Sequence, residues 1–361
     1  MIRRFLSRAR ALEQPVLPPV PDPILNKTLE LTPDLILTAL TDPMEAHSQV
    51  KNLARNRFGP GVELGKDVRL KHPLDQLLHL PREALWSNPQ AAIIRDSTEE
   101  LIDAAKHLTH DEIFNRHYGP VDPGSYNLAA YMRCTRLRIL RLYQALERRG
   151  VRGGTILEVG SLYGCFALIL QRLGFQVTAI DRYQSYGPGF HPLIALMKGA
   201  GVEVVGATRE NEEHALAALG EYDCGIAMAV VEHIPHTPRR FLEQLRRRVR
   251  TGGVMALDTP NLARYWNRMK LQSGESVFMN IRSQYHAEIP YEGHHREYTA
   301  DELRWIFEQL GCTDIESEHF DYNLIQFEAI DRPHIECLLH IVEDPAQADT
   351  ILVTGRVSRP Q

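Results

Sequence analysis

A short apolar run that ends at a glycine turn, followed by a lone acid one strand further on, is the feature of this sequence best suited to chemistry. Residues 155–166 read T-I-L-E-V-G-S-L-Y-G-C-F, and Asp181 closes the next apolar run in T-A-I-D-R. Backbone N–H groups at a helix start attract negative ligand groups, and glycine lets the backbone approach a ligand closely. A carboxylate at the end of the next strand can accept both hydroxyls of a ribose. The two features together predict a nucleoside site.

The spacing of the glycines discriminates between classes of nucleoside. A dinucleotide fingerprint needs G-x-G-x-x-G, in which the second glycine leaves room for a pyrophosphate. The turn here is Gly160-Ser161-Leu162-Tyr163-Gly164, with Leu162 at the middle position. It therefore argues against NAD or FAD, and a dehydrogenase is a remote alternative that NADH fluorescence enhancement would reveal.

An alternation of strand and helix patterns surrounds this turn. Short β-branched apolar runs predict buried parallel strands, and apolar residues at three- and four-residue steps predict helices between them. A long helix is expected at 125–149, and a late one begins at Thr299, which forms a capping box with Glu302. The strands are expected at 155–159, 175–180, 202–205, 224–230, 254–257, 313–320 and 350–357. The last two, close together at the end of the alternation, suit an antiparallel edge on a mostly parallel sheet.

Four segments together resemble the class I S-adenosylmethionine (SAM) methyltransferases, in the broad group of quinone, sugar and natural-product enzymes. Residues 158–164, E-x-G-x-x-x-G, resemble their motif I without its middle glycine, and 222–236, which contain V-V-E-H-I-P-H, resemble their segment after strand four. Residues 248–261 resemble their glycine turn and fifth strand, and 293–303, G-H-H-R-E-Y-T-A-D-E-L, resemble the stretch before their last helix. The resemblance implies a Rossmann-like α/β fold of seven mostly parallel strands, with helices on both faces and an antiparallel edge strand.

The resemblance also implies the cofactor, S-adenosyl-L-methionine, with S-adenosyl-L-homocysteine as product. By that resemblance the two glycines flank the methionine part of SAM, Glu158 steadies the loop and Asp181 holds the ribose. The expected cofactor residues are Glu158, Gly160, Ser161, Gly164, Asp181, Arg182, Thr208, Val231 and Glu232. After the third strand, where relatives often show an acid that hydrogen-bonds adenine, this chain reads A-T-R-E at 207–210, so the adenine contact stays open between Thr208, Glu210 and backbone.

Histidines near the carboxyl ends of the strands are the expected acid–base groups. Methyl transfer is an in-line displacement on a sulfonium, and a hydroxyl acceptor must also lose a proton. Ligands of open α/β sheets bind beyond the carboxyl ends of the strands, where His233 follows strand four. His233 is the first candidate for the base, with His294 and His295 next, and holding a loop or capping a helix is the alternative role. No metal is expected, because His233 and His236 lie three apart on a proline-containing loop without a carboxylate cluster.

An insertion at 262–298, rich in aromatic and polar groups, is expected to form a lid or to bind the acceptor. Such mixed surfaces suit a ring bearing hydroxyls, whether sugar or phenol. The expected acceptor contacts are His236, Asn261, Tyr265, Tyr285 and Tyr298. The alternative is that this insertion only packs against the core and does not bind the acceptor.

The remainder of the chain carries no motif for chemistry. Residues 1–24 are expected to be a flexible basic and proline-rich tail, and a transit peptide or membrane-surface arm is the less favoured interpretation. Residues 25–124 are expected to be a mainly helical extension that could mediate a homo-oligomer, with a helix capped by Ser97 and Glu100. The methyltransferase domain is then 125–361. Its first helix carries arginines expected on a solvated face: Arg133, Arg136, Arg141 and Arg148.

Length and composition narrow the function classes. A chain of 361 residues with 43% hydrophobic side chains can form a substantial core, and no apolar run approaches the roughly twenty residues of a membrane span. Five scattered cysteines without C-x-x-C indicate reduced thiols and a cytoplasmic setting. The net charge of -5 gives nucleic acid no general attraction, so no nucleic-acid partner is expected.

The favoured interpretation is a methyltransferase acting on a hydroxyl, or less favourably an amine, of a small molecule such as a sugar or secondary metabolite. A nucleic-acid methyltransferase that modifies base amines would typically show (N/D)-P-P-(Y/F) after strand four, where this chain has V-E-H-I-P-H. A catalytically silent scaffold with the same fold is the third alternative, which the leucine in the glycine turn keeps open. Calorimetry with SAM separates the enzyme from the scaffold.

Overall fold

The structure, a computed structural model, describes residues 27–71, 78–79, 89–122, 126–323, 329–330 and 332–358. The predicted tail, residues 1–24, lies outside the described residues. The seven-stranded sheet has the order β6 (Glu203–Gly206), β5 (Gln176–Asp181), β4 (Thr155–Val159), β7 (Tyr222–Met228), β8 (Val249–Pro260), β11 (Thr350–Val357) and β9 (Cys312–Phe320). The first five are parallel, and β11 pairs antiparallel with both β8 and β9. The predicted sheet, including its antiparallel strand near one edge, is confirmed.

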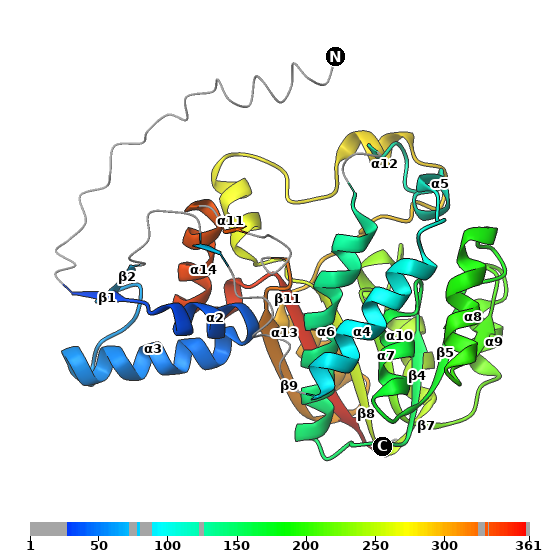
Figure 1. Ribbon diagram of the computed structural model, residues 1–361, viewed down its shortest axis with the longest axis horizontal. Coiled ribbons are helices and arrows are strands. Elements are labelled where there is room, and N and C mark those ends of the chain that lie inside the picture. Colours follow the sequence, from blue (N-terminus) through cyan, green and yellow to red (C-terminus); the bar gives the residue numbers. More distant parts are fainter. Residues whose placement is uncertain are drawn as a thin grey trace.

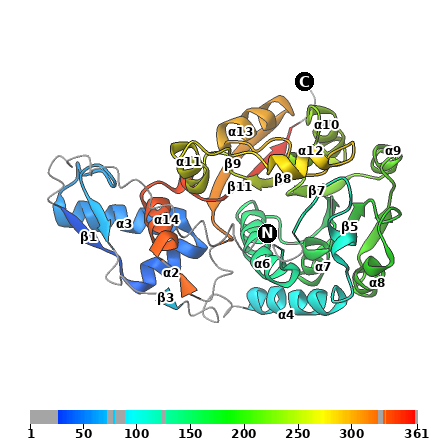
Figure 2. The ribbon, with the colours of Figure 1, turned by 90° about the horizontal axis from the view of Figure 1, so that it is seen from above.

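Helices cover both faces of this sheet, as predicted, and each face buries its own apolar core. On one face lie α6 (Leu128–Arg148), α7 (Cys165–Arg172) and α8 (His191–Gly199), with α4 (Pro89–Ala104) packed against all three (Figure 1). On the other lie α9 (Glu212–Ala217), α10 (Arg239–Arg247) and α13 (Ala300–Gln309) (Figure 2). The predicted capping box of Thr299 and Glu302 opens α13.

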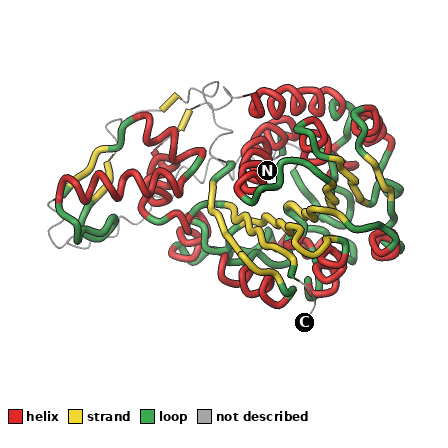
Figure 3. The backbone as a smooth tube through the Cα atoms, turned by 90° about the horizontal axis from the view of Figure 1, so that it is seen from below, coloured by secondary structure: helices red, strands yellow, loops and turns green. Residues whose placement is uncertain are grey.

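The N-terminal part of the chain divides between two surroundings. α2 (Pro33–Thr41) and α3 (Pro43–Phe58) pack with α14 (Arg332–Glu343), which comes from the other end of the chain. β1 (Thr28–Glu30) and β2 (Arg69–Lys71) pair beside them, and β3 (Leu78–His79) pairs with β10 (Ala329–Ile330). Figure 3 shows this lobe next to the layered sheet, whereas α4 belongs to the layers. The boundary predicted at residue 124 stays a prediction.

The predicted helix start at Ser97 is wrong. α4 already begins at Pro89, so Ser97 lies inside it, 1% exposed, where its hydroxyl accepts a hydrogen bond from Arg172 Nη1 at 2.9 Å. The capping box of this region is formed by Thr109 and Glu112, at the start of α5 (His110–Ile113). A serine with an acid three residues later also occurs inside helices, and proline at the first turn marked the true start.

The arginines of α6 are not all solvated, which corrects a second expectation. Arg136 forms an ion pair with Glu99 of α4. Arg141 forms ion pairs with Asp42 and with Glu318, both at 2.7 Å. Both arginine side chains are more than nine-tenths buried. A helical pattern cannot show that α4 and β9 bring acids over the polar face. Arg133 and Arg148 remain about half exposed.

All five cysteines are buried and free of disulfides. Among the described residues, none of the helices combines the length and apolar character that crossing a membrane requires.

Candidate active site

The turn between β4 and α7 folds over the carboxyl end of the sheet and depends on its glycines. Gly160 and Gly164 have φ of 82° and 77°, and a Cβ on them would overlap the side chains of Val230 and Met197. Leu162, at the place of the missing glycine, also has a positive φ, of 45°. The turn therefore keeps a left-handed conformation at a residue where an L side chain is strained, at a cost of about 1–3 kcal/mol.

Asp181, the last residue of β5, is hydrogen-bonded to this turn. Its Oδ2 accepts the backbone N–H of Leu162 at 2.6 Å, and its Oδ1 accepts the N–H of Arg182 at 2.6 Å and the hydroxyl of Tyr186. Burial raises the pKa of this carboxyl. The structure therefore brings the predicted acid and the predicted turn into direct contact, and a ribose would share the carboxylate with Tyr186.

Buried polar atoms without a protein partner lie at the end of β4. Glu158 is 2% exposed, its Oε2 has no hydrogen-bond partner, and burial raises its pKa to about 8. The hydroxyl oxygen of Ser161 is also buried and makes no hydrogen bond of ordinary geometry, and the nearby Ser161 side chain acts against the rise in the pKa of Glu158. Buried polar groups are normally hydrogen-bonded, so these two fit a polar ligand group that approaches the turn.

The other predicted cofactor residues lie around the same end of the sheet. Arg182 makes ion pairs with Glu212 and Glu292, and the backbone N–H of Thr208 donates to Asn211 Oδ1 at 2.7 Å. Val231 has its side chain in the apolar core, so only its backbone could face a ligand.

A second cluster follows β7 at the same end of the sheet. Glu232, His233 and His294 offer ligand-type atoms that all lie within 4.8 Å of one another. The two imidazole rings meet edge to face, with centroids 4.7 Å apart. Glu232 is fully buried, one carboxylate oxygen accepts Thr259 Oγ1 at 3.1 Å, and the other has no partner. Burial raises the pKa of Glu232 to about 7.

The hydrogen bonding of His233 defines its tautomer. Its Nδ1 lies 2.7 Å from the backbone oxygen of Glu292. A carbonyl can only accept, so Nδ1 carries the proton and Nε2 keeps its lone pair. Burial lowers the pKa of His233 to about 4, so the imidazole is neutral at physiological pH. The unprotonated imidazole is the state from which a general base acts, although a base with a pKa near neutrality is better suited to take up a proton.

His294 is placed by a chain of charged groups. Its Nδ1 lies 3.5 Å from Glu297 Oε1, and Glu297 accepts two hydrogen bonds from Arg264 at 2.7 and 3.0 Å and one from Asn267 at 3.0 Å. Although burial opposes it, the hydrogen-bond donors around Glu297, His294 and Arg264 first among them, lower its pKa to about 2. His294 therefore faces a fixed negative charge.

His295 anchors the loop rather than joining the cluster. Its N–H donates to the backbone oxygen of Glu232 at 2.7 Å, and its Nε2 lies 2.9 Å from the backbone oxygen of Tyr291. The segment 293–296 is thereby tied to the segment that follows β7.

The five predicted acceptor contacts lie in separate surroundings. The amide of Asn261 donates to the carbonyls of Ala346 and Ala348 and accepts from Ala263. Tyr265 stacks on His340, and Tyr298 is buried beneath the guanidinium of Arg296. His236 is exposed on the loop after β7, and Tyr285 is 79% exposed on the helix α12 (Ile281–His286). Their role in binding an acceptor stays a prediction.

Several contacts near the site were not foreseen. Aromatic rings run in contact from Phe114 through Tyr126, Tyr131, Tyr163 and Phe190 to Tyr186, beside Asp181. The density of tyrosines between residues 114 and 131 was the available signal. Asp258, near the end of β8, accepts two hydrogen bonds from Arg138 of α6, at 2.8 and 2.7 Å. Both side chains of this ion pair are buried. Because Arg138 and Asp258 are 120 residues apart, no pattern within a short stretch of the sequence could have predicted that they pair.

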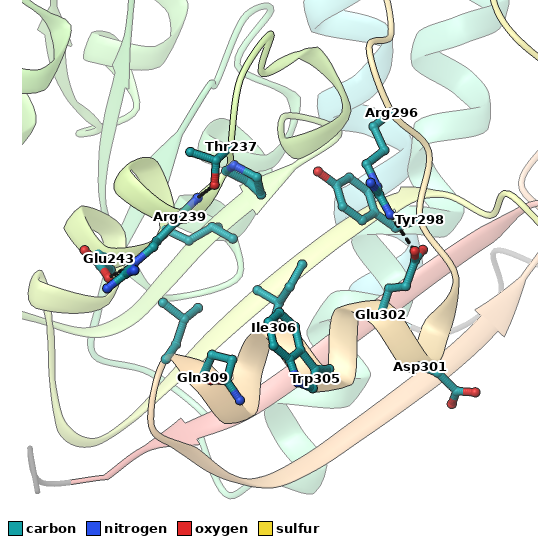
Figure 4. A pocket seen from close by; sticks show the side chains of 13 residues that line it. Thr237, Arg239, Glu243, Arg296, Tyr298, Asp301, Glu302, Trp305, Ile306 and Gln309 are labelled. Carbon is teal, nitrogen blue, oxygen red and sulfur yellow. Dashed lines mark hydrogen bonds and ion pairs between the residues drawn. The ribbon is translucent and has the colours of Figure 1, made fainter.

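A cavity of about 740 Å³ opens elsewhere, on the face covered by α10 and α13. Thr237, Arg239 and Glu243 line one side, and Arg296, Trp305 and Gln309 line the other (Figure 4). Of the predicted site residues only Tyr298 borders it. The cavity is therefore separate from the glycine turn and from the cluster of Glu232, His233 and His294.

Known proteins resemble part of this chain. The curated ubiquinone biosynthesis O-methyltransferase of Escherichia coli O7:K1 is 35% identical over 132 residues, which are 35% of this chain and 51% of that protein. The chain thus spans about half the length of the curated relatives it matches. Among solved structures, the magnesium protoporphyrin IX methyltransferase of Synechocystis PCC 6803 with bound SAH aligns with TM-score 0.43 and 15% identity, over 69% of this chain and 94% of that one. Phosphoethanolamine N-methyltransferase 2 of Haemonchus contortus with SAM aligns with TM-score 0.40 and 14% identity, over 62% and 52%.

A family model described as a methyltransferase domain matches residues 129–317. The matched range contains the glycine turn, Asp181 and both histidine segments. The chain belongs to this methyltransferase-domain family, within the class I enzymes whose cofactor is S-adenosyl-L-methionine.

Proposed function

We propose that this chain transfers the methyl group of SAM to a hydroxyl of a small molecule, with His233 as the base. The observation that carries the proposal is the hydrogen bond from Nδ1 of His233 to the backbone oxygen of Glu292, which leaves Nε2 unprotonated. A hydroxyl acceptor must lose its proton during transfer, whereas a neutral amine can attack before it loses one. The curated relatives carry the name O-methyltransferase, in agreement with a hydroxyl acceptor.

The residues around the glycine turn fit the cofactor. The carboxylate of Asp181 would hold the ribose, and the unpartnered polar atoms of Glu158 and Ser161 would meet polar groups that approach the turn. When bound, SAM supplies a sulfonium whose methyl carbon is open to in-line attack. The aromatic rings from Phe114 to Tyr186 would exclude water from this side.

Nε2 of His233 would accept the hydroxyl proton as the acceptor oxygen takes the methyl group that SAM supplies. Glu232 lies beside the imidazole and would stabilise the positive charge that His233 gains. His294 sits edge to face with His233 and is held by Glu297, so it would orient the acceptor. The proton leaves to solvent after product release, which restores the neutral imidazole.

A labelled-methyl screen over phenols, sugars and amines tests the acceptor class. We expect transfer to a hydroxyl compound, and a loss of that transfer in His233→Ala that leaves SAM affinity nearly unchanged. Transfer to amines alone would contradict the hydroxyl assignment. No SAM binding at millimolar concentration in calorimetry would favour the silent scaffold.

A further inference from the structure

Glu292, within the predicted lid (262–298), contacts both the loops expected to bind the cofactor and the proposed base, His233. Its Oε1 accepts Arg182 Nη1 at 3.2 Å and Arg209 Nη2, and its Oε2 accepts Asn115 Nδ2 at 3.0 Å. The side chain is only 17% exposed. The backbone oxygen of the same residue accepts a hydrogen bond from His233 Nδ1.

The two arginines connect this residue to the cofactor side of the sheet. Arg182 directly follows Asp181 at the end of β5, and Arg209 follows Thr208 in the loop after β6. These are the loops expected to contact the ribose and the adenine. A carboxylate held by two guanidinium groups in a mostly buried position is strongly localised, because charge-assisted hydrogen bonds are the strongest and most directional available.

We infer that Glu292 is a positioning residue for His233: its carboxylate, clamped by Arg182 and Arg209, places its carbonyl so that the proton stays on Nδ1. This inference rests on the proposed role of His233. The ion pairs of Glu292 would link the positions of the loops that carry Arg182 and Arg209 to the tautomer of His233, because the loops and His233 all contact Glu292.

The rest of the lid has its own attachments. The segment 281–292, which includes α12 (Ile281–His286), lies beside the segment after α5 at one end of the molecule (Figure 1). The N–H of Glu288 donates to the oxygen of Arg116 at 3.0 Å, and Ser283 Oγ donates to the oxygen of Pro120 at 2.9 Å. The N–H of Glu292 itself donates to the oxygen of His117 at 2.9 Å. Loss of the Glu292 carboxylate should therefore loosen the carbonyl locally without releasing the lid.

Nitrogen-15 NMR of the histidine side chains in the full chain tests the inference. The signal of His233, assigned with His233→Gln, should show the Nδ1–H form alone in the unchanged chain. In Glu292→Ala it should show a mixture of the two tautomers, and turnover should fall between about tenfold and a hundredfold, less than on loss of the base itself. The Michaelis constant for the acceptor should change less than turnover. Glu292→Gln can still accept hydrogen bonds, so it should recover most of the Nδ1–H tautomer and most of the turnover that Glu292→Ala loses.

Two further variants keep the inference testable. Arg209→Ala removes one arm of the clamp from a different loop and should shift the tautomer in the same direction, even where Glu292→Ala fails to fold. Glu288→Ala is the matched control, because it breaks an exposed ion pair of the same lid with Arg116, at 3.0 Å, and should leave His233 unchanged. A single Nδ1–H tautomer in both Glu292→Ala and Arg209→Ala would overturn the inference. Absence of methyl transfer in the unchanged chain would instead overturn the proposed function, while the tautomer comparison still stands.

Discussion

The backbone N–H of Leu162 donates to Oδ2 of Asp181 across 2.6 Å, so the acid at the end of β5 closes the glycine turn that follows β4. The two parallel strands are neighbours, and their carboxyl ends meet at one edge of the sheet. Asp181 consequently has two tasks. It holds Leu162 in a left-handed conformation and it presents the carboxylate expected to bind the ribose.

Asp181→Ala should weaken SAM affinity by one or more orders of magnitude. Each charge-assisted hydrogen bond to the ribose is worth about 1.5–3 kcal/mol, and the variant also removes the acceptor that holds Leu162. Isothermal calorimetry measures the affinity, with circular dichroism as the check of folding. Asp181→Asn keeps the shape of the group and should show a smaller loss. Unchanged affinity in both variants would remove Asp181 from the cofactor site.

Gly160→Ala should destabilise the chain more than Gly150→Ala. Both glycines have positive φ, so each variant carries backbone strain of about 1–2 kcal/mol. A Cβ at Gly150 meets nothing within 4 Å, whereas a Cβ at Gly160 would overlap Val230 and adds about 1–3 kcal/mol of overpacking. Urea unfolding of the two variants measures the difference in the free energy of unfolding. Equal losses would show that Val230 yields without cost.

Elements set by local pattern were predictable, and elements set by distant partners were not. The strands and the capping box of Thr299 and Glu302 follow from the order of residues along a short stretch. The burial of Arg141 depends on Asp42 and Glu318, which are remote in the sequence. No periodicity within one helix contains that information.

The same distinction holds within the candidate site. His233 and His294 were named from separate motifs, and the structure brings their rings together. Glu292 carries no motif of its own, and its place is visible only once Arg182 and His233 approach it from different strands. Glu232 was predicted to contact the cofactor, which stays a prediction, and the structure places its carboxylate within 4.8 Å of ligand-type atoms of both histidines.

His233→Ala should lower turnover by a factor of about 10² to 10⁴, the usual contribution of a general base, with SAM affinity nearly unchanged. His214→Ala is the matched control, since His214 is an exposed histidine of α9 that belongs to none of the predicted sites and should retain activity. Steady-state assays with labelled SAM, using the acceptor found in the screen, provide both values. Turnover at the level of the unchanged chain would reduce His233 to a structural role.

Removal of divalent metal should leave turnover unchanged, since the sequence predicts no metal in the mechanism. The assay compares the chain before and after treatment with EDTA, with and without added zinc or manganese. Loss of activity that either metal restores would contradict the prediction. Glu232, His233 and His294 would then be the ligands to examine, because their ligand-type atoms already lie within 4.8 Å of one another.

The free energy of unfolding should fall as the pH rises from about 4.5 to 8, in part because of Glu158. Burial raises the pKa of this carboxyl from 4.5 to about 8, so the folded chain binds the proton more tightly than the unfolded chain does. The stabilisation from that proton is complete below the unfolded pKa and is lost as the pH approaches the folded one. His233 acts in the opposite direction, since burial lowers its pKa from 6.5 to about 4 and its contribution to stability grows with pH across that range.

Glu158→Gln keeps a neutral group of the same shape and isolates the effect of Glu158. Urea unfolding between pH 5 and 8 should show a smaller fall for Glu158→Gln than for the unchanged chain, and parallel curves would mean that Glu158 is ionised in the folded state.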